Sequence, residues 1–272
     1  MKNPKISVIM AVYNEEKYIR EAIESILNQT FRDFEFIIVD DGSTDNTPKI
    51  LEEYAKKDSR IRILRNEKNI GLTKSLNKAI KQAKGEYIAR MDADDIAMKE
   101  RLEKQLDFME KNPDVGLVGT SFYFINEEGK ILGKNIYPTK DEDLRRILIK
   151  NNTFCHPSIM IRKEVFDKIG LYDESFETSQ DYELYFRVAK YFKLANLEEP
   201  LLYWRVSKES ISFKNEIKQR KNTIKAQIKA IKNGQYPTYC LIYILRPLLA
   251  ILVPSKIKYL VRRYILKRKY TF

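Results

Sequence analysis

Residues 87–95 read YIARMDADD, a short apolar segment that ends in aspartates. Residues 87–91 have the composition of a buried strand, and Asp92, Asp94 and Asp95 place three like charges within the next four positions. Three explanations are open: a solvated turn, because Asp is common in loops; an EF-hand loop; and a site for a divalent cation, which binds carboxylate oxygens and shares them with substrate phosphates. The EF-hand is disfavoured, because Ile96 stands at a ligand position and Ala97 replaces the required Gly.

The first hundred residues alternate apolar runs with stretches of helical periodicity. The pattern predicts strands at residues 6–12, 34–39, 60–64 and 87–91, separated by helices at residues 16–28, 48–57 and 72–84. Thr47 is expected to cap the second helix, whose first position is Pro48, and Gly85 to close the third. Four strand–helix units in a row predict an α/β fold with a mostly parallel central sheet, flanked by helices and joined by right-handed crossovers.

Polar residues follow each of the four predicted strands. They read YNE at 13–15, DDGS at 40–43, RN at 65–66 and DADD at 92–95. In open α/β sheets ligands bind outside the carboxyl ends of the strands, so these loops are expected to meet at one edge. That placement favours a binding site over a solvated turn for the three aspartates.

The motifs that are missing narrow the class of ligand. No GxGxxG follows the first strand, and no GxxxxGK[ST] occurs in the sequence, which disfavours a dinucleotide fold and a P-loop. Carboxylates do not bind phosphates directly, but they hydrogen-bond a base or ribose and hold a diphosphate through a cation. A nucleoside diphosphate compound with Mg²⁺ or Mn²⁺ meets these conditions.

Composition bounds the setting of the protein. A length of 272 residues with 43% hydrophobic residues is sufficient for a sizeable core. Cys155 and Cys240 form no CxxC pair, so neither a disulfide framework nor a zinc site is predicted, and a cytoplasmic setting is expected. Residues 201–272 contain 17 Lys+Arg and 2 Asp+Glu, which leaves 33 and 36 of the totals of 50 and 38 for residues 1–200. The strongly cationic end favours nucleic acid or an anionic membrane surface as a partner.

Five longer motifs extend these observations. They are SVIMAVYNEEKYIREAIESILNQT, FIIVDDGSTDNT, NIGLTKSLNKAIKQAKGEYIARMDADD, HPSIMIRKEVFDKIGLYDE and SQDYELYFRVAK. Together they resemble family 2 glycosyltransferases with the GT-A (nucleotide-diphospho-sugar transferase) fold, over about residues 5–213. The resemblance implies a nucleotide-sugar-binding half at 1–98, an acceptor-binding half at 99–213 and a helical C-terminal extension at 214–272. It also implies transfer of a sugar from a nucleoside-diphosphate sugar, commonly a UDP-sugar.

The resemblance implies roles for single residues. Nucleotide binding falls to Ala11, Tyr13, Glu15, Asp40, Asp41, Gly42, Ser43, Lys74, Arg90, Asp92 and Ala93. Asp40 matches the acid that reads the base, while Lys74 and Arg90 fit surface cations equally well. Asp94 is implied as the direct ligand of Mn²⁺ or Mg²⁺ and Asp92 as a ligand through water. His156, the only histidine, fits either a metal contact or a structural hydrogen-bonding residue.

Asp181 matches the catalytic base of the family, although Gln180 stands where Glu is frequent. The expected reaction displaces a nucleoside diphosphate whose leaving charge a cation stabilises, while Asp181 takes the proton of the acceptor hydroxyl. One displacement inverts the anomeric centre. Asp181 also fits a plain helix cap. No QxxRW motif of the processive synthases occurs, so the addition of one sugar is expected.

Periodicity also predicts the elements of the second half. They are a helix at 99–111, a hairpin of strands 115–125 and 130–137, a helix at 141–150, a short apolar strand in LLYWRV and a Lys-rich helix at 208–233. None of these elements identifies the acceptor.

The C-terminal residues suggest where the acceptor is. Residues 238–254 are apolar apart from Arg246, but a span needs roughly 20 such residues, so a transmembrane helix is disfavoured. Residues 255–270 alternate an apolar stripe with cations, as in helices that lie on anionic lipid. The sequence therefore predicts peripheral attachment through residues 236–272 to the inner face of the cell membrane and a saccharide or lipid-linked acceptor. The alternatives are packing on the catalytic body or on a second copy in a homo-oligomer, a nucleic-acid-binding tail, which is disfavoured, and a nucleotidyltransferase.

Overall fold

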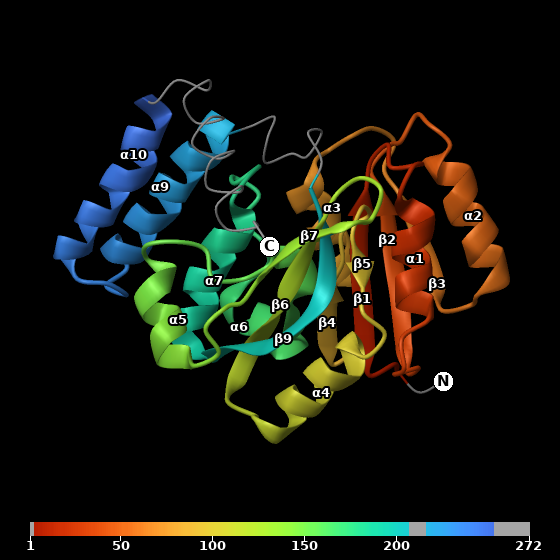
Figure 1. The fold of residues 1–272 in the computed structure, drawn as a ribbon, viewed down its shortest axis with the longest axis horizontal. Coiled ribbons are helices and arrows are strands. Elements are labelled where there is room, and N and C mark those ends of the chain that lie inside the picture. The colour runs from red at the N-terminus through yellow and green to blue at the C-terminus, as the bar shows by residue number, and fades with distance from the viewer. Residues whose placement is uncertain (1–2, 207–215, 253–272) are drawn as a thin grey trace.

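The computed structural model describes residues 3–206 and 216–252. A nine-stranded sheet runs through it, with helices on both faces (Figure 1). The strands are β1 (Ile6–Val12), β2 (Phe34–Asp40), β3 (Ile61–Arg65), β4 (Tyr87–Arg90), β5 (Ile96–Ala97), β6 (Val115–Ile125), β7 (Ile131–Asn135), β8 (Met160–Arg162) and β9 (Lys193–Arg205). The helices are α1 (Ile19–Leu27), α2 (Thr47–Lys57), α3 (Leu72–Gln82), α4 (Arg101–Lys111), α5 (Asp141–Leu148), η1 (His156–Ser158), α6 (Lys163–Ile169), α7 (Gln180–Tyr191), α9 (Glu216–Lys232), η2 (Thr238–Ile244) and α10 (Leu245–Leu252).

The first half of the sheet is parallel, in the order β3-β2-β1-β4. Val12 pairs with Asp40, and Ile9 pairs with Arg90, so the loops after β1, β2 and β4 leave from the same edge. The four strand–helix units predicted from periodicity are confirmed. The convergence of their polar loops at one edge is confirmed with them.

The second half of the sheet mixes both pairing directions. β8 is antiparallel to β4 and β6, β9 is parallel to β6, and the short β5 is antiparallel to β9. The predicted hairpin is present as β6 and β7. The predicted α/β class is confirmed, with a parallel first half and a sheet that continues as a mixed second half.

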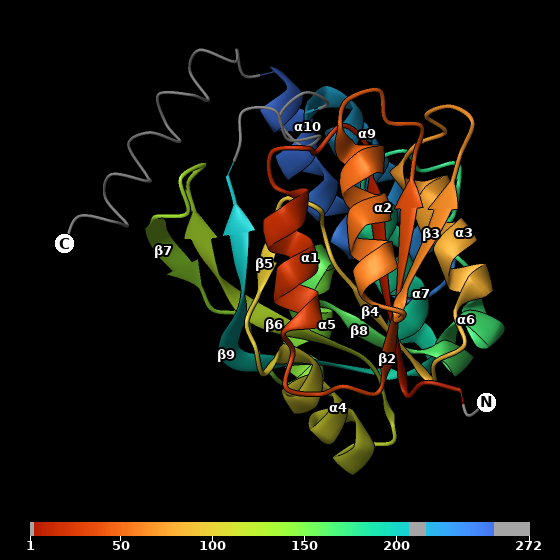
Figure 2. The same ribbon diagram turned by 90° about the vertical axis from the view of Figure 1, so that its right-hand side faces the viewer.

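Helices cover both faces of the sheet (Figure 2), and the buried side chains form two cores. Alternate residues of β1, including Val8 and Met10, pack with α1, α2 and α4 in one core. Ile9, which points the other way, packs with α3, α6 and α7 in the second. This explains why the strands read as continuous apolar runs, since a parallel strand between two helical layers has no solvated face.

The predicted cap of α2 is wrong in its detail. The helix begins at Thr47, and Asn46 occupies the cap position. The Thr47 hydroxyl instead accepts a hydrogen bond from the Glu15 backbone N–H at 2.9 Å, and the Asp45 carboxylate accepts one from Thr47 N–H at 2.9 Å. The side chain thus ties the loop after β1 to the loop after β2.

Helix α4 joins the two halves of the sheet through buried polar groups. The Arg101 guanidinium donates to the carbonyls of Arg90 and Ile159 at 2.6 and 3.4 Å. One turn later the Gln105 amide donates to Ser158 O at 2.8 Å and to Val118 O at 3.2 Å. Arg101 and Gln105 are both fully buried. One helix therefore holds the end of β4, the segment around η1 and the strand β6 in one arrangement.

The C-terminal helices form a layer beyond α7. α9 packs against α7, and η2 and α10 pack against α9; Figure 1 shows them at the opposite end of the long axis from α2. The Lys-rich helix predicted from residue 208 is present as α9 from Glu216 onward. Within the described residues no helix has the length and apolarity needed to cross a membrane. The segment predicted to be amphipathic, residues 255–270, lies outside the described residues.

Candidate active site

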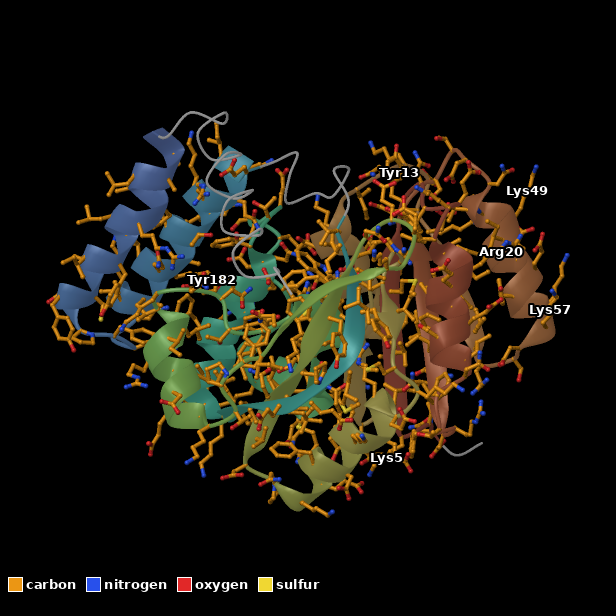
Figure 3. All side chains as sticks on the ribbon, viewed as in Figure 1. Lys5, Tyr13, Arg20, Lys49, Lys57 and Tyr182 are labelled. Atoms are coloured by element: carbon orange, nitrogen blue, oxygen red, sulfur yellow. The ribbon has the colours of Figure 1, made fainter. Side chains whose placement is uncertain are left out.

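The loops after β1 and β2 form one side of the candidate site. Asn14, in a left-handed conformation with φ of 54°, accepts a hydrogen bond from Thr44 N–H through its side-chain oxygen at 2.8 Å. In return, the Ser43 hydroxyl accepts one from Asn14 N–H at 3.0 Å. Asp40 is buried and accepts one from Ser43 N–H at 3.0 Å. The two loops thus hold each other in place, with Tyr13 exposed at their rim (Figure 3).

Asp41 and Gly42 bring the loop after β2 close to the residues that precede α3. Asp41 accepts hydrogen bonds from the backbone N–H groups of Ile70 and Gly71, both at 2.9 Å, and from the Asn66 amide at 2.8 Å. These hydrogen bonds occupy the Asp41 carboxylate and hold the start of α3 in place. Gly42 has φ of +76°, and a Cβ there would lie 2.7 Å from the carbonyl carbon of Lys68. Glycine fits both the backbone conformation and the lack of space.

The remaining predicted nucleotide contacts lie around these loops. Ala11 is half-buried on β1, Ala93 is buried beside the aspartates, and Glu15 is half-buried where its N–H meets Thr47. Lys74 is exposed on the first turn of α3, close enough to Glu177 for its charge to help lower the pKa of that carboxyl. The structure brings Ala11, Glu15 and Ala93 to the sheet edge and leaves Lys74 on the surface.

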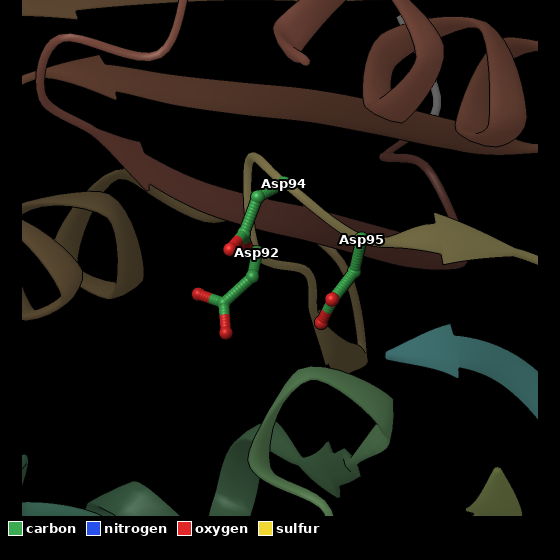
Figure 4. Close-up of side chains that lie close together, drawn as sticks. All are labelled: Asp92, Asp94 and Asp95. Atoms are coloured by element: carbon green, nitrogen blue, oxygen red, sulfur yellow. The ribbon is translucent and has the colours of Figure 1, made fainter. Parts of the chain in front are cut away.

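The three aspartates after β4 gather into one cluster (Figure 4). One carboxylate oxygen from each of Asp92, Asp94 and Asp95 lies within 4.8 Å of the others. Burial and then the charge of Asp92 raise the pKa of Asp94 to about 6, and burial and its two neighbours raise the pKa of Asp95 well above its usual range. Such mutual repulsion is relieved by a proton or by a cation.

A divalent cation fits the oxygens of this cluster. Among the described residues, the buried Asp95 Oδ2 has no hydrogen-bond partner, while Asp92 and Asp94 are partly exposed. Oxygens on opposite sides of a Mg²⁺ ion are about 4 Å apart, and hard cations prefer carboxylates. Small side-chain rotations would therefore suffice for Asp94 and Asp92 to bind one ion, which would keep free positions for the oxygens of a bound substrate.

Arg205 fixes the loop that carries the aspartates. Its backbone N–H donates to Asp95 Oδ1 at 2.8 Å, and its guanidinium donates to Asp94 O at 2.8 Å. The same guanidinium reaches Glu21 Oε2 at 2.7 Å and stacks over the Tyr18 ring with its central carbon 4.3 Å from the centroid. The end of β9 thus connects the acidic loop to α1.

Arg90 links the acidic cluster to the second half of the site. It is buried and donates to the Asp92 carboxylate. His156 Nε2 forms a hydrogen bond with the Tyr172 hydroxyl at 2.8 Å. Burial and then the positive charge of Arg90 hold the pKa of His156 well below its usual range, so the imidazole is neutral near pH 7. The aspartate cluster contains carboxylates alone, and His156 lies outside it.

Asp181 lies in the first turn of α7, after Gln180 and the left-handed Ser179, whose φ is 57°. Burial raises the pKa of Asp181, while the Tyr182 N–H, the Asn152 amide at 2.8 Å and the charge of Arg90 oppose that rise. The carboxylate is a residue of the helix and not its cap, since Ser179 occupies the cap position. A partly buried carboxylate with a raised pKa is suited to accepting a proton.

Residues 7–170 of the chain match the family described as Glycosyl transferase family 2. The chain is a member of this family. Its relatives include the uncharacterized glycosyltransferase MJ1057 of Methanocaldococcus jannaschii, 43% identical over 226 residues, which are 81% of this chain and 77% of that protein. The O-antigen biosynthesis glycosyltransferase WbnJ of Escherichia coli is 40% identical over 210 residues, 75% of this chain and 81% of WbnJ. The protein is therefore a glycosyltransferase and not a nucleotidyltransferase.

Two solved structures confirm the GT-A fold of this family 2 glycosyltransferase. S. aureus TarS in complex with UDP-GlcNAc superposes with a TM-score of 0.70 at 23% identity, covering 89% of this chain and 72% of that one. The mannosyltransferase PcManGT from Pyrobaculum calidifontis, in complex with GDP-Man and Mn²⁺, gives 0.67 at 18% identity and covers 98% and 81%. At these identities the likeness establishes the fold alone.

Three residues that position groups of the candidate site could not be recognised from the sequence. Arg205 lies 110 residues from Asp95, Tyr172 bonds His156, and Asn152 bonds Asp181. Tyr172 lies in the fourth quoted motif, but nothing in the sequence marks it as the partner of His156. The only signal for Arg205 was a cation at the end of the apolar run LLYWR, which is unusual for a strand that packs in a core.

Proposed function

We propose that this enzyme moves one sugar from a UDP-sugar to a saccharide or lipid-linked acceptor by a single, inverting displacement that requires Mn²⁺ or Mg²⁺. The observation that carries the proposal is the cluster of Asp92, Asp94 and Asp95 at the edge where the parallel strands end. Support for UDP comes from TarS, whose solved structure holds UDP-GlcNAc, and support for the cation from PcManGT, whose solved structure holds Mn²⁺. PcManGT also holds GDP-Man, so the choice of nucleotide is part of the test.

The loops after β1 and β2 would bind the nucleoside. Asp40 is buried next to the Ser43 N–H it accepts from, so its other oxygen is suited to a hydrogen bond with a base N–H. Arg65 Nε lies 3.7 Å from that oxygen. The exposed ring of Tyr13 at the rim offers an apolar face for the base.

Asp94 and Asp92 would hold the cation, which stabilises negative charge on the departing diphosphate. Asp92 also accepts a hydrogen bond from Arg90, which limits its orientations before a donor arrives. Ala93, between the two acids, is buried and leaves room for the sugar donor without a competing side chain.

Asp181 would accept the proton of the attacking hydroxyl. Its partners Asn152 and Arg90 stabilise the ionised form, while burial raises the pKa and makes it a stronger base than an exposed carboxylate. A base on the side of the sugar opposite to the diphosphate requires direct attack, which inverts the anomeric centre.

The expected location is the cytoplasm, with peripheral attachment to the inner face of the membrane.

The test begins with calorimetric titration of the protein with UDP, GDP and dTDP, with and without Mn²⁺. We expect one nucleotide, UDP, to bind, and to bind more tightly with Mn²⁺. Asp94→Asn should lose the metal-dependent part, while Asp181→Asn should keep donor binding and lose transfer. Binding of no nucleotide, or transfer by either variant at the parent rate, would refute the assignment. The product configuration, read by NMR of the anomeric proton, tests inversion.

A further inference from the structure

The helices at the end of the described chain pack through a narrow stripe. Cys240 and Ile244 of η2 and Pro247 of α10 are buried, and these three residues mark the side of the two helices that packs on the body. This side packs against α9. The stripe accounts for how the two helices attach to the body and leaves their other side uncovered by the described residues.

The uncovered side is apolar. Its six exposed side chains, with their exposed fractions, are Tyr239 (74%), Leu241 (48%), Ile242 (62%), Leu245 (54%), Leu248 (44%) and Leu249 (61%). We call this set the η2–α10 face. A surface helix of a soluble protein presents polar residues on its outer side, and a contiguous apolar patch of this kind marks a binding surface for protein or membrane.

The charged residues of η2, α10 and the sequence that follows them are of one sign. No acidic residue occurs in the sequence after Glu216, and residues 253–272 carry seven Lys and Arg. Arg246 is exposed within the face. Lys150, on the neighbouring body, lies with its ammonium 5.0 Å from the centroid of the Tyr243 ring. An apolar surface that carries Arg246 and lies beside Lys150, in a C-terminal region rich in cations, complements a bilayer that contains anionic lipid.

We propose that the η2–α10 face inserts into the interfacial layer of an anionic membrane, with the cations that border it on the lipid phosphates. A second copy of the chain fits poorly, because a symmetric contact through the same face would bring Arg246 of both copies into one interface. Nucleic acid would use the cations but not the six apolar side chains. The proposal rests on the proposed function and narrows it: the acceptor is a saccharide carried on a membrane lipid.

The face is firmly connected to the segment that carries Asp181. The Asn222 amide of α9 donates to Thr178 O at 3.0 Å, and the Ser179 hydroxyl donates to Gln219 O at 3.1 Å. Further along α9 the Gln227 amide donates to Ile149 O at 2.7 Å. A docked enzyme would therefore hold the start of α7 at a fixed position relative to the lipid, as transfer to a lipid-linked saccharide requires.

The experiment is flotation of the full chain with vesicles of phosphatidylcholine alone and of phosphatidylcholine with phosphatidylglycerol. The test variant carries Ile242→Glu, Leu245→Glu and Leu249→Glu. The matched control carries Ile131→Glu, Leu132→Glu and Ile136→Glu, three apolar residues of similar exposure in and beside β7. Both variants add the same charge. Circular dichroism and UDP titration of each preparation show that the fold and the donor site are intact.

We expect the parent and the control to float with anionic vesicles and the test variant to lose about tenfold or more in the bound fraction, because a charge in the apolar interface is unfavourable. Equal binding of all three proteins, or no flotation of the parent, overturns the proposal. So does a parent dimer that the test variant turns into a monomer without any change in flotation. Intact UDP binding in each case leaves the proposed function standing, whereas loss of UDP binding in the parent would refute that function instead.

Discussion

Arg205→Met should loosen the loop that carries the aspartates while leaving its packing in place. The Arg205 guanidinium donates to the carbonyls of Asp94, Asn126 and Glu127 at 2.8, 3.2 and 2.9 Å. Its side chain is almost fully buried. Met fills a similar volume but offers no donor, so the variant removes these hydrogen bonds, the stacking on Tyr18 and the ion pair with Glu21. Glu21 is more than half exposed, so that ion pair adds little to stability.

The expected loss of stability follows from these contacts. Three partly buried hydrogen bonds at about 1 kcal/mol each and the stacking on Tyr18 at about 1 kcal/mol add to about 4 kcal/mol. For a chain of this size, 1 kcal/mol shifts the midpoint of thermal unfolding by roughly 2–4 °C. Arg205→Met should therefore unfold roughly 10 °C below the parent, as measured by circular dichroism.

The same variant should weaken the cation site, although Arg205 is not one of its proposed ligands. Residues that orient metal ligands typically change metal affinity by about 10–100-fold, and calorimetric titration of Mn²⁺ in the presence of UDP measures this. Lys17→Ala is the control, because Lys17 forms an ion pair with Glu127 at 2.8 Å with both side chains exposed, and neither quantity should change. An unfolding midpoint within roughly 2 °C of the parent and unaltered Mn²⁺ affinity would refute the role given to Arg205.

Three further predictions concern the loops around the site. Gly42→Ala should lower stability by about 1–3 kcal/mol and weaken UDP binding, whereas Gly129→Ala, with φ of +80° in open space, should cost less and leave UDP binding unchanged in the same titrations. Asn152→Ala removes a donor that lowers the pKa of Asp181. The pKa should therefore rise further, and the acid limb of the pH–rate profile should move to higher pH, because the base must be ionised. His156→Gln should keep Mn²⁺ affinity, because the ring forms a hydrogen bond with Tyr172 and lies outside the aspartate cluster. A loss of Mn²⁺ affinity in the same titration would show that the ring is a metal ligand.

The local pattern of the sequence was enough to predict the first half of the fold. Apolar runs such as residues 6–12 are buried on both faces, and the alternation with helices admits few topologies. The second half depends on contacts that no local pattern contains. β9 is a strand of 13 residues, yet only its end was visible as LLYWRV, because its start pairs with Val115 and the residues that follow it, more than seventy residues earlier in the chain.

The candidate site shows the same limit. The acids of residues 92–95 were conspicuous because like charges rarely gather without a reason. The groups that position them were not, since a single Arg or Asn has no meaning in a sequence until its partner is known. Thr47 shows that a local signal can also mislead. Its residue type and its place before Pro48 predicted a helix cap, but its hydroxyl instead accepts a hydrogen bond from the Glu15 N–H.

The buried hydrogen bonds that Arg101 and Gln105 form to both halves of the sheet have a consequence for the design of chimeric enzymes. A designer who wishes to combine the donor preference of one relative with the acceptor preference of another would choose the junction near residue 98. At that junction the crossover would take the Arg90 carbonyl from one parent, and Arg101 with its second acceptor, the Ile159 carbonyl, from the other. Chimeras should therefore fold best when the end of β4, α4 and the segment around η1 come from the same parent.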